Sequence, residues 1–173
     1  PIPIGTDRPQ RRFPWMNVLL IVANVALFFL TRGRGGGLAR GWDDYMLSSL
    51  HPHLMQFITY QFLHGSIFHI LFNMLSLWMF GVELERMWGS RFFLTFYLVT
   101  GVGAGLTQII ASLVPVDALS SLYYAQTIGA SGAIYGLLMA YAMYFPNRQI
   151  VFWGVFPILV KYFVLIMGGI SLI

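Results

Sequence analysis

The sequence contains no cysteine and few charged residues. The absence of cysteine excludes disulfide bonds and thiol catalysis within these 173 residues. Charged residues make up only 9% of the chain, whereas a soluble domain carries about 25%, which solvate its surface. A folded chain with so little charge would expose large apolar areas to water. We therefore expect lipid, not water, to surround most of this protein.

Basic runs and metal-binding clusters are missing too. The ten Lys and Arg residues give a formal net charge of +4, but they are scattered, whereas a nucleic-acid-binding protein gathers them on one face. A metal site needs three or four converging ligands. The four histidines have no histidine or acidic partner in the third or fourth apolar block. We expect no nucleic-acid partner, no metal and no other cofactor.

Hydrophobic residues make up 58% of the chain and form long unbroken runs. Only helical bundles and closed barrels satisfy every backbone polar group in hydrocarbon, and barrel strands would alternate apolar and polar residues. The unbroken runs predict an all-α, polytopic helical bundle. We expect about five spans, at residues 15–30, 67–82, 92–114, 131 to just before 146, and 161 onward.

The last expected span is short. Residues 161–173 reach only about 20 Å as a helix, whereas the hydrocarbon core is about 30 Å thick. We therefore expect a bundle of six or more spans that is incomplete at its C-terminus. Residues 1–14 are expected to be a cytoplasmic N-terminal segment and residues 15–173 a single transmembrane domain.

Positive charges predict the orientation, because cytoplasmic loops are richer in Lys and Arg. One side of the expected spans carries Arg8, Arg11, Arg12, Arg86, Arg91, Arg148 and Lys161, and the other carries Arg32, Arg34 and Arg40. We expect a multi-pass protein of a bacterial inner membrane with its N-terminus in the cytoplasm. The sequence does not indicate the oligomeric state.

Two connecting segments are apolar without being expected spans. The outer loop from Thr31 to His53 begins with a glycine-rich stretch, and its later half is expected to lie at the membrane interface through Trp42, Tyr45, Met46 and Leu47. The segment between Arg148 and Lys161 is broken by Gly154 and Pro157. We interpret it as an interfacial or re-entrant connector.

Polar residues inside the second expected span form a first candidate site. Such groups are costly in a membrane without partners, so each is a functional hypothesis. His69 and Asn73 are four residues apart, which places both on one helix face. His64 is five positions before His69, and we expect it to face elsewhere, near the outer interface.

The run from Gly129 to Gly136 forms a second candidate site. Ser131 stands at the mouth of a helix between Gly129 and Gly132, and these small neighbours leave its hydroxyl open. The free N–H groups of the first helical turn could hold an oxyanion. Tyr135 is one turn further on and faces the same way. Gly132 and Gly136 also form a small-xxx-small face for helix packing.

Each candidate site has a purely structural interpretation as well. A single Gly-x-Ser-Gly is usually a helix-packing motif. Intramembrane hydrogen bonds from His or Asn contribute about 0.6 kcal/mol each as packing interactions. Gly101, Gly103 and Gly105 of the third expected span are interpreted as packing residues.

Together the two motifs resemble the rhomboid family of intramembrane serine proteases. The stretch Phe-Leu-His-Gly-Ser-Ile-Phe-His-Ile-Leu-Phe-Asn-Met-Leu, at 62–75, is similar to the family's second helix, and 129–136 is similar to its nucleophile motif at the start of the fourth helix. Residues 81–85 resemble the end of the second helix. The resemblance extends over nearly the whole chain from Trp15 onward.

The resemblance implies a role for each of these residues. Ser131 would be the nucleophile, assisted by its neighbours Gly129 and Gly132. His69, Asn73 and the Ser131 N–H would hold the oxyanion. Tyr135 would stack beneath a histidine base, and His64 would order the outer loop. The substrates would be single-span transmembrane proteins.

The resemblance also has two departures. The family's base lies in a sixth helix within an Ala-His motif, so it is expected beyond Ile173, and the 173-residue polypeptide alone is expected to be inactive because serine needs a neighbouring base. In the outer loop, Met55 and Gln56 replace a Trp-Arg pair. The alternative function is that of a non-catalytic rhomboid-like protein that binds transmembrane clients. Such relatives usually lack the nucleophile motif.

Overall fold

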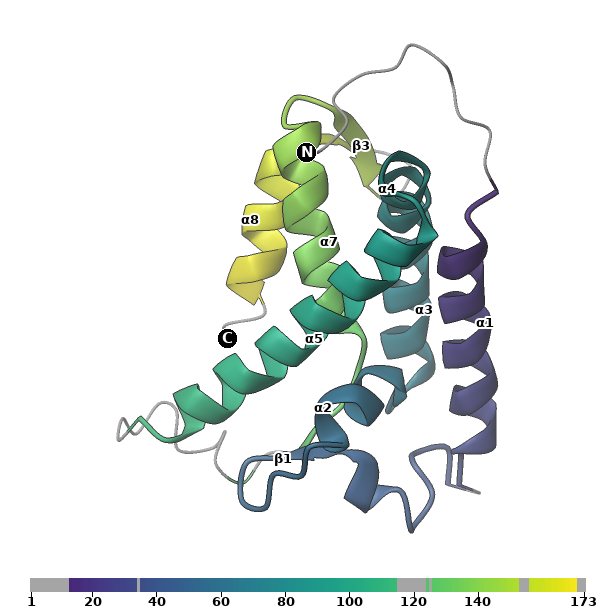
Figure 1. The fold of residues 1–173 in the computed structure, drawn as a ribbon, viewed down its shortest axis with the longest axis vertical. Helices are drawn as coiled ribbons and strands as arrows, with labels where there is room; N and C mark the ends of the chain where they lie inside the picture. Colours follow the sequence, from purple (N-terminus) through teal and green to yellow (C-terminus); the bar gives the residue numbers. More distant parts are fainter. Residues whose placement is uncertain (1–12, 34, 115–123, 125, 153–155, 171–173) are drawn as a thin grey trace.

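The chain folds into a bundle of helices with two small pairs of strands (Figure 1). The computed structural model describes residues 13–33, 35–114, 124, 126–152 and 156–170. Its main helices are α1 (Trp15–Leu30), α3 (Ile67–Ser76), α4 (Val82–Trp88), α5 (Ser90–Ser112), α7 (Ser131–Tyr144) and α8 (Val160–Ile170). The short helices are η1 (Asp43–Tyr45), α2 (Gln56–Thr59) and η2 (Tyr60–Phe62), and η3 (Leu77–Gly81) is a π-helical turn.

Helix length and composition agree with a polytopic membrane protein. Within the described ranges, two helices are long and apolar enough to cross a membrane, Ile67–Trp88 and Ser90–Ser112, and Trp15–Leu30 is a shorter apolar helix. The expected bounds of the first apolar helix are confirmed residue for residue by α1. The expected end of the second span at Val82 was too early: α3, η3 and α4 continue to Trp88. The helix stops only at Gly89, whose φ of 82° favours glycine.

The two ends of the bundle hold different helices and strands. One end, called here the Glu85 end, holds α4 and the first turn of α1 (Figure 1). The other, called the β1 end, holds α2 and the strand β1 (Leu47–Ser48). The helix α5 runs obliquely between them and contacts α1, α2, α4 and α7. It therefore forms the scaffold on which the other helices are placed.

Glu85 joins three helices at the Glu85 end. Its carboxylate is buried and accepts hydrogen bonds from the backbone N–H groups of Met16 at 3.0 Å and Asn17 at 2.7 Å. It also accepts one from Ser90 Oγ at 2.5 Å. The first N–H groups of a helix have no partner within the helix, and the helix dipole favours a negative charge there. Glu85 of α4 thus caps α1 and holds the start of α5.

Small residues allow α5 and α7 to pack closely, as the small-xxx-small pattern predicted. A Cβ atom at Gly132 would lie 2.5 Å from the Ala104 Cβ, and one at Gly136 would lie 2.6 Å from the Thr100 Cβ. A side chain at either position would clash with α5, so the packing interpretation of Gly132 and Gly136 is confirmed.

Amide side chains fill the space beside other glycines. Asn17 of α1 occupies the position that a Cβ at Gly81 would need, and Gln61 of η2 does the same at Gly101 of α5. Both amides are fully buried. The packing interpretation of Gly101 is therefore confirmed, and so is that of Gly105, which lies against Leu47 and Phe57. The same interpretation is wrong for Gly103, which is exposed and has none of the described residues within 4 Å of its Cβ position.

The segment after α7 is a β-hairpin. Strand β3 (Gln149–Phe152) pairs antiparallel with β4 (Phe156–Leu159), with Gln149 opposite Leu159. The Val160 N–H donates to the Arg148 carbonyl at 2.9 Å, which closes the hairpin at the start of α8. The prediction that this segment is not a span is confirmed, but the hairpin was not predicted. Gly154 lies outside the described residues.

The loop between α1 and α2 is partly buried. Trp42 and Tyr45 lie together with ring centroids 5.3 Å apart, and Tyr45 is exposed. Leu47 is 1% exposed and belongs to the core, so its expected place at the membrane interface is wrong. The reason is that β1 pairs with β2 (Gln126–Thr127), with Leu47 opposite Thr127. This pairing draws the loop onto the bundle.

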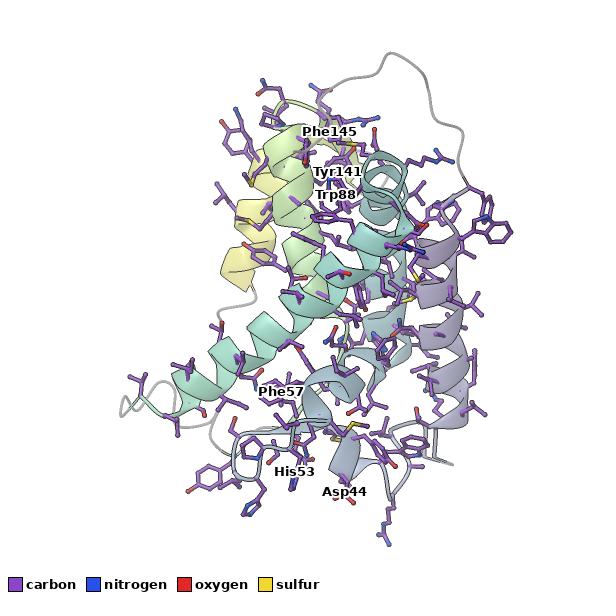
Figure 2. All side chains as sticks on the ribbon, in the orientation of Figure 1. Asp44, His53, Phe57, Trp88, Tyr141 and Phe145 are labelled. Atoms are coloured by element: carbon purple, nitrogen blue, oxygen red, sulfur yellow. The ribbon has the colours of Figure 1, made fainter. Side chains whose placement is uncertain are left out.

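Gln56 anchors the same loop. It is one of the two residues, with Met55, that stand where the resemblance leads us to expect a Trp-Arg pair. Its side chain is buried, and its Oε1 accepts from the N–H groups of His53 at 3.1 Å and Ser48 at 3.4 Å. Its Nε2 donates to the Asp44 carbonyl at 3.1 Å. Figure 2 shows Asp44 and His53 together at the β1 end. The uncharged amide of Gln56 therefore anchors this loop, although the Trp-Arg pair expected from the resemblance is absent.

Candidate active site

His69 and Asn73 lie on one face of α3. Ser66 caps this helix, because its Oγ accepts a hydrogen bond from the His69 N–H at 3.2 Å. Asn73 is buried and His69 is half-buried. The Asn73 Nδ2 has no hydrogen-bond partner in the described part of the chain. A buried donor without an acceptor costs free energy, so this amide is a candidate to bind an incoming oxygen atom.

Gly129 brings the two sequence motifs together. It is buried and has a φ of 120°, a backbone conformation that L side chains rarely adopt. A Cβ at this position would lie 2.6 Å from the His69 Nε2 and 3.7 Å from the Asn73 Nδ2. Only a residue without a side chain allows the turn before α7 to lie directly against the imidazole and the amide of α3. The required glycine is two residues before Ser131.

Ser131 is the first residue of α7 and is exposed. The preceding residue, Ala130, makes no side-chain cap. The first N–H groups of an α-helix have no acceptor within the helix, and here the first bond found is from the Ile134 N–H to the Ala130 carbonyl. The hydroxyl of Ser131 and the unused N–H groups of its turn therefore stand at the same helix terminus.

His64 lies beside His69, not away from it. The two ring centroids are 5.0 Å apart in an edge-to-face arrangement, and His64 is 1% exposed. The expectation that His64 faces elsewhere is wrong, because α3 begins only at Ile67 and helical periodicity does not apply to the preceding loop. Burial lowers the pKa of His64 to about 4, and His69 adds to this effect. His64 is therefore neutral at physiological pH.

Tyr135 points from α7 toward α8. Its hydroxyl lies 3.5 Å from the Val164 carbonyl, and its side chain is half-buried. Tyr135 is one helical turn after Ser131. Tyr135 therefore lies between α7 and α8, one helical turn from Ser131.

Sequence reasoning missed Tyr60, which contacts the turn before Ser131. The carbonyl of Tyr60 accepts a hydrogen bond from the Gly129 N–H at 2.8 Å. Its hydroxyl donates to the Gly101 carbonyl at 2.6 Å. No local pattern marks Tyr60, because both partners are distant in the sequence.

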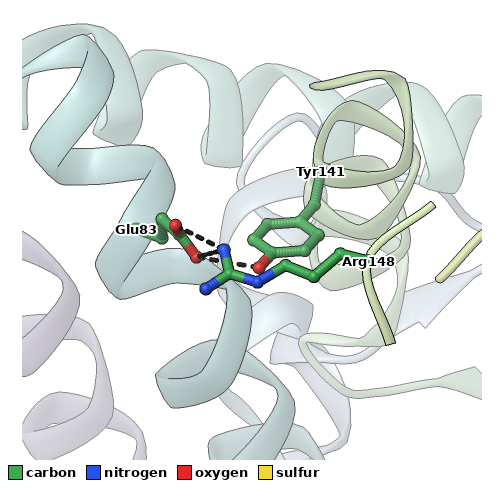
Figure 3. A network of polar contacts seen from close by, with 3 residues as sticks. All are labelled: Glu83, Tyr141 and Arg148. Carbon is green, nitrogen blue, oxygen red and sulfur yellow. Dashed lines mark hydrogen bonds and ion pairs between the residues drawn. The ribbon is translucent and has the colours of Figure 1, made fainter. Parts of the chain in front are cut away.

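A second polar cluster lies at the Glu85 end, where Glu83 was interpreted from the sequence as part of a solvated or paired cap with Arg86, and its partners Tyr141 and Arg148 were not predicted. Glu83 of α4 accepts hydrogen bonds from the Tyr141 hydroxyl at 2.8 Å and from the Arg148 guanidinium at 2.5 and 2.6 Å (Figure 3). The hydrogen bond to Glu83 is the main cause that raises the pKa of Arg148. The Tyr141 ring also lies near the Phe145 ring, with centroids 4.8 Å apart (Figure 2). This cluster joins α4, α7 and the start of the hairpin far from Ser131, and we interpret it as structural.

A metal centre has no support among the described residues. No group of three or more His, Asp or Glu side chains there could hold an ion. A cavity of about 310 Å³ lies at the Glu85 end, between Trp15, Arg86 and Ser90. It is therefore not the site around Ser131.

Comparison with known proteins gives the family. A family model described as the rhomboid domain matches residues 51–173. The chain is 32% identical over 137 residues to the rhomboid protease GluP of Bacillus subtilis (strain 168), covering 76% of this chain and 25% of that protein. It is 29% identical over 163 residues to RHOMBOID-like protein 1 of Arabidopsis thaliana, covering 74% and 39%. It is 26% identical over 133 residues to the rhomboid protease GlpG of Yersinia pestis (strain Pestoides F), covering 70% and 48%.

These similarities agree with the helical fold and with the apolar spans. The chain belongs to the rhomboid family and is an integral membrane protein. It is similar to members named as rhomboid proteases, which places it in a family of membrane-embedded hydrolases. The chain spans between a quarter and a half of the length of these curated relatives.

Proposed function

We propose that the full-length protein is an intramembrane serine endopeptidase with Ser131 as its nucleophile. The observation that carries this proposal is the contact of Gly129 with His69 and Asn73, because it brings the serine motif of α7 against the polar face of α3. In the reaction, Ser131 Oγ would attack the scissile carbonyl carbon and lose its proton to a base. The amine would leave, and water would hydrolyse the resulting ester.

The oxyanion would be held by groups from both helices. Its donors would be the Asn73 amide, the His69 imidazole and the Ser131 N–H. Donors that are already oriented where negative charge develops contribute more in a site of low dielectric constant than in water. The free Nδ2 of the buried Asn73 supports this role. The neutral His64 beside His69 would help to order the loop before α3.

The length of α7 favours a site below the membrane surface. Its 14 residues extend about 21 Å, less than the hydrocarbon thickness of about 30 Å. With its Tyr144 end at one interface, Ser131 would lie well inside the other. We propose that water reaches it from the β1 end, which positive charges place on the outer side, with the N-terminus in the cytoplasm of a bacterial cell.

The base would be a histidine on a helix outside this segment. None of the four histidines of the chain occupies the corresponding position by resemblance. The 173-residue polypeptide alone is therefore expected to be inactive, and a stack of the base on Tyr135 is part of the same proposal. We propose single-span transmembrane proteins as substrates, with no metal or other cofactor in the reaction.

A serine-reactive fluorophosphonate probe tests the nucleophile in membranes that contain the full-length protein. We expect wild-type protein to be labelled and Ser131→Ala to be unlabelled. Ser76→Ala, which removes a half-buried hydroxyl at the end of α3, should label like wild type. Equal labelling of wild type and Ser131→Ala would show that Ser131 is not the nucleophile.

A non-catalytic client-binding protein is the alternative. It would show no Ser131-dependent labelling, yet it would still bind transmembrane segments. The labelling experiment therefore separates the two functions without knowledge of the natural substrate.

A further inference from the structure

We infer that Tyr60 is a positioning residue that fixes the nucleophile turn of α7 onto α5. This inference rests on the proposed function, because it assigns to Tyr60 the placement of Ser131. Tyr60 is 3% exposed and lies where α2 passes into η2, outside both sequence motifs.

The first contact that carries the inference is made by the backbone of Tyr60. Its carbonyl accepts the Gly129 N–H at 2.8 Å. The same glycine lies against His69 and Asn73 on its other side. The turn before Ser131 is thus held between the η2 backbone and the polar face of α3.

The second contact is made by the side chain. The hydroxyl of Tyr60 lies 3.4 Å from the position that a Cβ at Gly132 would occupy. Gly132 is the residue after Ser131. Tyr60 therefore lies beside the chain on both sides of the nucleophile: its carbonyl binds the Gly129 N–H, and its hydroxyl faces the open side of Gly132.

The third contact ties this arrangement to the scaffold. The Tyr60 hydroxyl donates to the Gly101 carbonyl at 2.6 Å. One turn further along α5, a Cβ at Gly105 would lie 3.4 Å from Tyr60 Cε1. Gly105 thus leaves room for the Tyr60 ring, and Tyr60 connects α5 with the first turn of α7. Loss of the hydroxyl would let this turn shift while the ring and the Gly129 hydrogen bond remain.

The test uses the full-length protein in membranes and a fluorophosphonate probe at several concentrations, which separates the maximal labelling rate from the apparent affinity. For Tyr60→Phe we expect the maximal rate to fall about tenfold, because small misplacements of reacting atoms slow chemistry by up to about 100-fold. The apparent affinity should change less than about twofold, because probe binding does not depend on the hydroxyl.

Tyr97→Phe is the matched control. Tyr97 is fully buried on α5, and its hydroxyl lies beside Asn24 of α1. Its removal should leave the maximal rate within about twofold of wild type. If Tyr60→Phe keeps the wild-type rate, or if both variants slow equally, the positioning role is refuted while Ser131 labelling of wild type still supports the proposed function. Absence of Ser131-dependent labelling in wild type would instead refute the proposed function and this role with it.

A second measurement does not depend on the folding of Tyr60→Phe. With 3-fluorotyrosine at position 60, which keeps the hydroxyl, the maximal labelling rate should stay near that of wild type. Its fluorine resonance should shift when Ser131 is labelled. With 3-fluorotyrosine at position 97 the resonance should not move. No shift at position 60, or equal shifts at both positions, would contradict the contact between Tyr60 and the nucleophile turn.

Discussion

At the scale of single residues, Gly129 combines two constraints. Its φ of 120° disfavours any L side chain, and the space for a Cβ is taken by the His69 imidazole. The sequence identified Gly129 as a small neighbour that keeps Ser131 open. The structure adds a second reason for glycine, which is the contact between two helices that are distant in the sequence. This reason could not be derived from the sequence around Gly129, because no neighbouring residue indicates that Gly129 packs against His69 and Asn73.

Replacement of Gly129 by alanine should strongly reduce fluorophosphonate labelling and should change the stability of the fold much less. The added Cβ must push His69 away, so we expect Gly129→Ala to reduce the maximal fluorophosphonate labelling rate by about 100-fold or more. The measurement is labelling of the full-length protein in membranes, together with thermal unfolding in detergent.

Gly103→Ala is the matched control for this prediction. Its Cβ would meet nothing within 4 Å in the described part of the chain, and alanine in a helix is favoured over glycine by about 0.5–1 kcal/mol. We expect normal labelling and equal or higher stability. Full activity of Gly129→Ala would show that the contact with His69 is not needed.

His64 shows where residue-level prediction failed. The five-residue spacing to His69 places the two side chains on different faces only if both belong to one helix. Because Ser66 caps α3, His64 belongs to the loop before it, and its ring turns back onto His69. A Ser three residues before His69 was available as a capping signal, and its use would have corrected the expectation.

At the scale of elements, α1 depends on a residue of another helix for its N-terminal cap. We expect Glu85→Gln to lower the free energy of unfolding by about 1–2 kcal/mol, because the neutral amide loses the favourable charge at the helix terminus and one acceptor oxygen. The measurement is equilibrium unfolding in detergent micelles.

Glu83→Gln provides the comparison within the same helix. Its carboxylate is partly exposed, and exposed ion pairs contribute about 0–1 kcal/mol. The loss should therefore be smaller than for Glu85→Gln. Equal losses would mean that the cap of α1 contributes no more than the Arg148 ion pair.

The contact between Asn17 and Gly81 predicts a compensating pair of substitutions. Gly81→Ala forces a Cβ into the space of the Asn17 amide, and overpacking of this kind costs about 1–3 kcal/mol. In the double variant with Asn17→Ala, the space is free again. We expect the double variant to be less destabilised than the sum of the two single variants.

The same experiment needs a pair without contact. Asn17→Ala combined with Gly103→Ala should be additive within about 0.5 kcal/mol. If the stability changes of Asn17→Ala and Gly81→Ala were additive as well, the Asn17 amide would not occupy the space beside Gly81 in the membrane.

Elements were predicted unequally well, for physical reasons. The bounds of α1 follow from an apolar run that begins and ends abruptly, and the start of α7 follows from the glycine-serine motif at residues 129–132; both agree with the structure. The hairpin of β3 and β4 was not predicted, because a short apolar run of strand length has no periodicity that separates strand from connector. The burial of Leu47 depends on its pairing with Thr127, a partner far along the chain.

At the scale of the whole molecule, the orientation in the membrane remains a prediction. These 173 residues contain no cysteine, so a single cysteine introduced here is the only one in this segment and reports the accessibility of its own position. We expect His51→Cys, at the β1 end, to react with a membrane-impermeant maleimide added to intact cells. Asn147→Cys, in the turn after α7, should react only after permeabilisation. Both positions are exposed, and the reverse result would show that the N-terminus is outside.

The hairpin between α7 and α8 has one further consequence. Its register ends with Gln149 opposite Leu159, and α8 starts at the next residue. Because each helical residue turns by about 100°, one residue inserted in the first turn of α8, directly after the paired end of the hairpin, would rotate the rest of α8 by that angle. Phe163 and Val164 are now buried against the bundle, and such an insertion would turn them toward lipid. The hairpin thus fixes the rotation of α8 about its own axis, and so determines which of its side chains face the bundle.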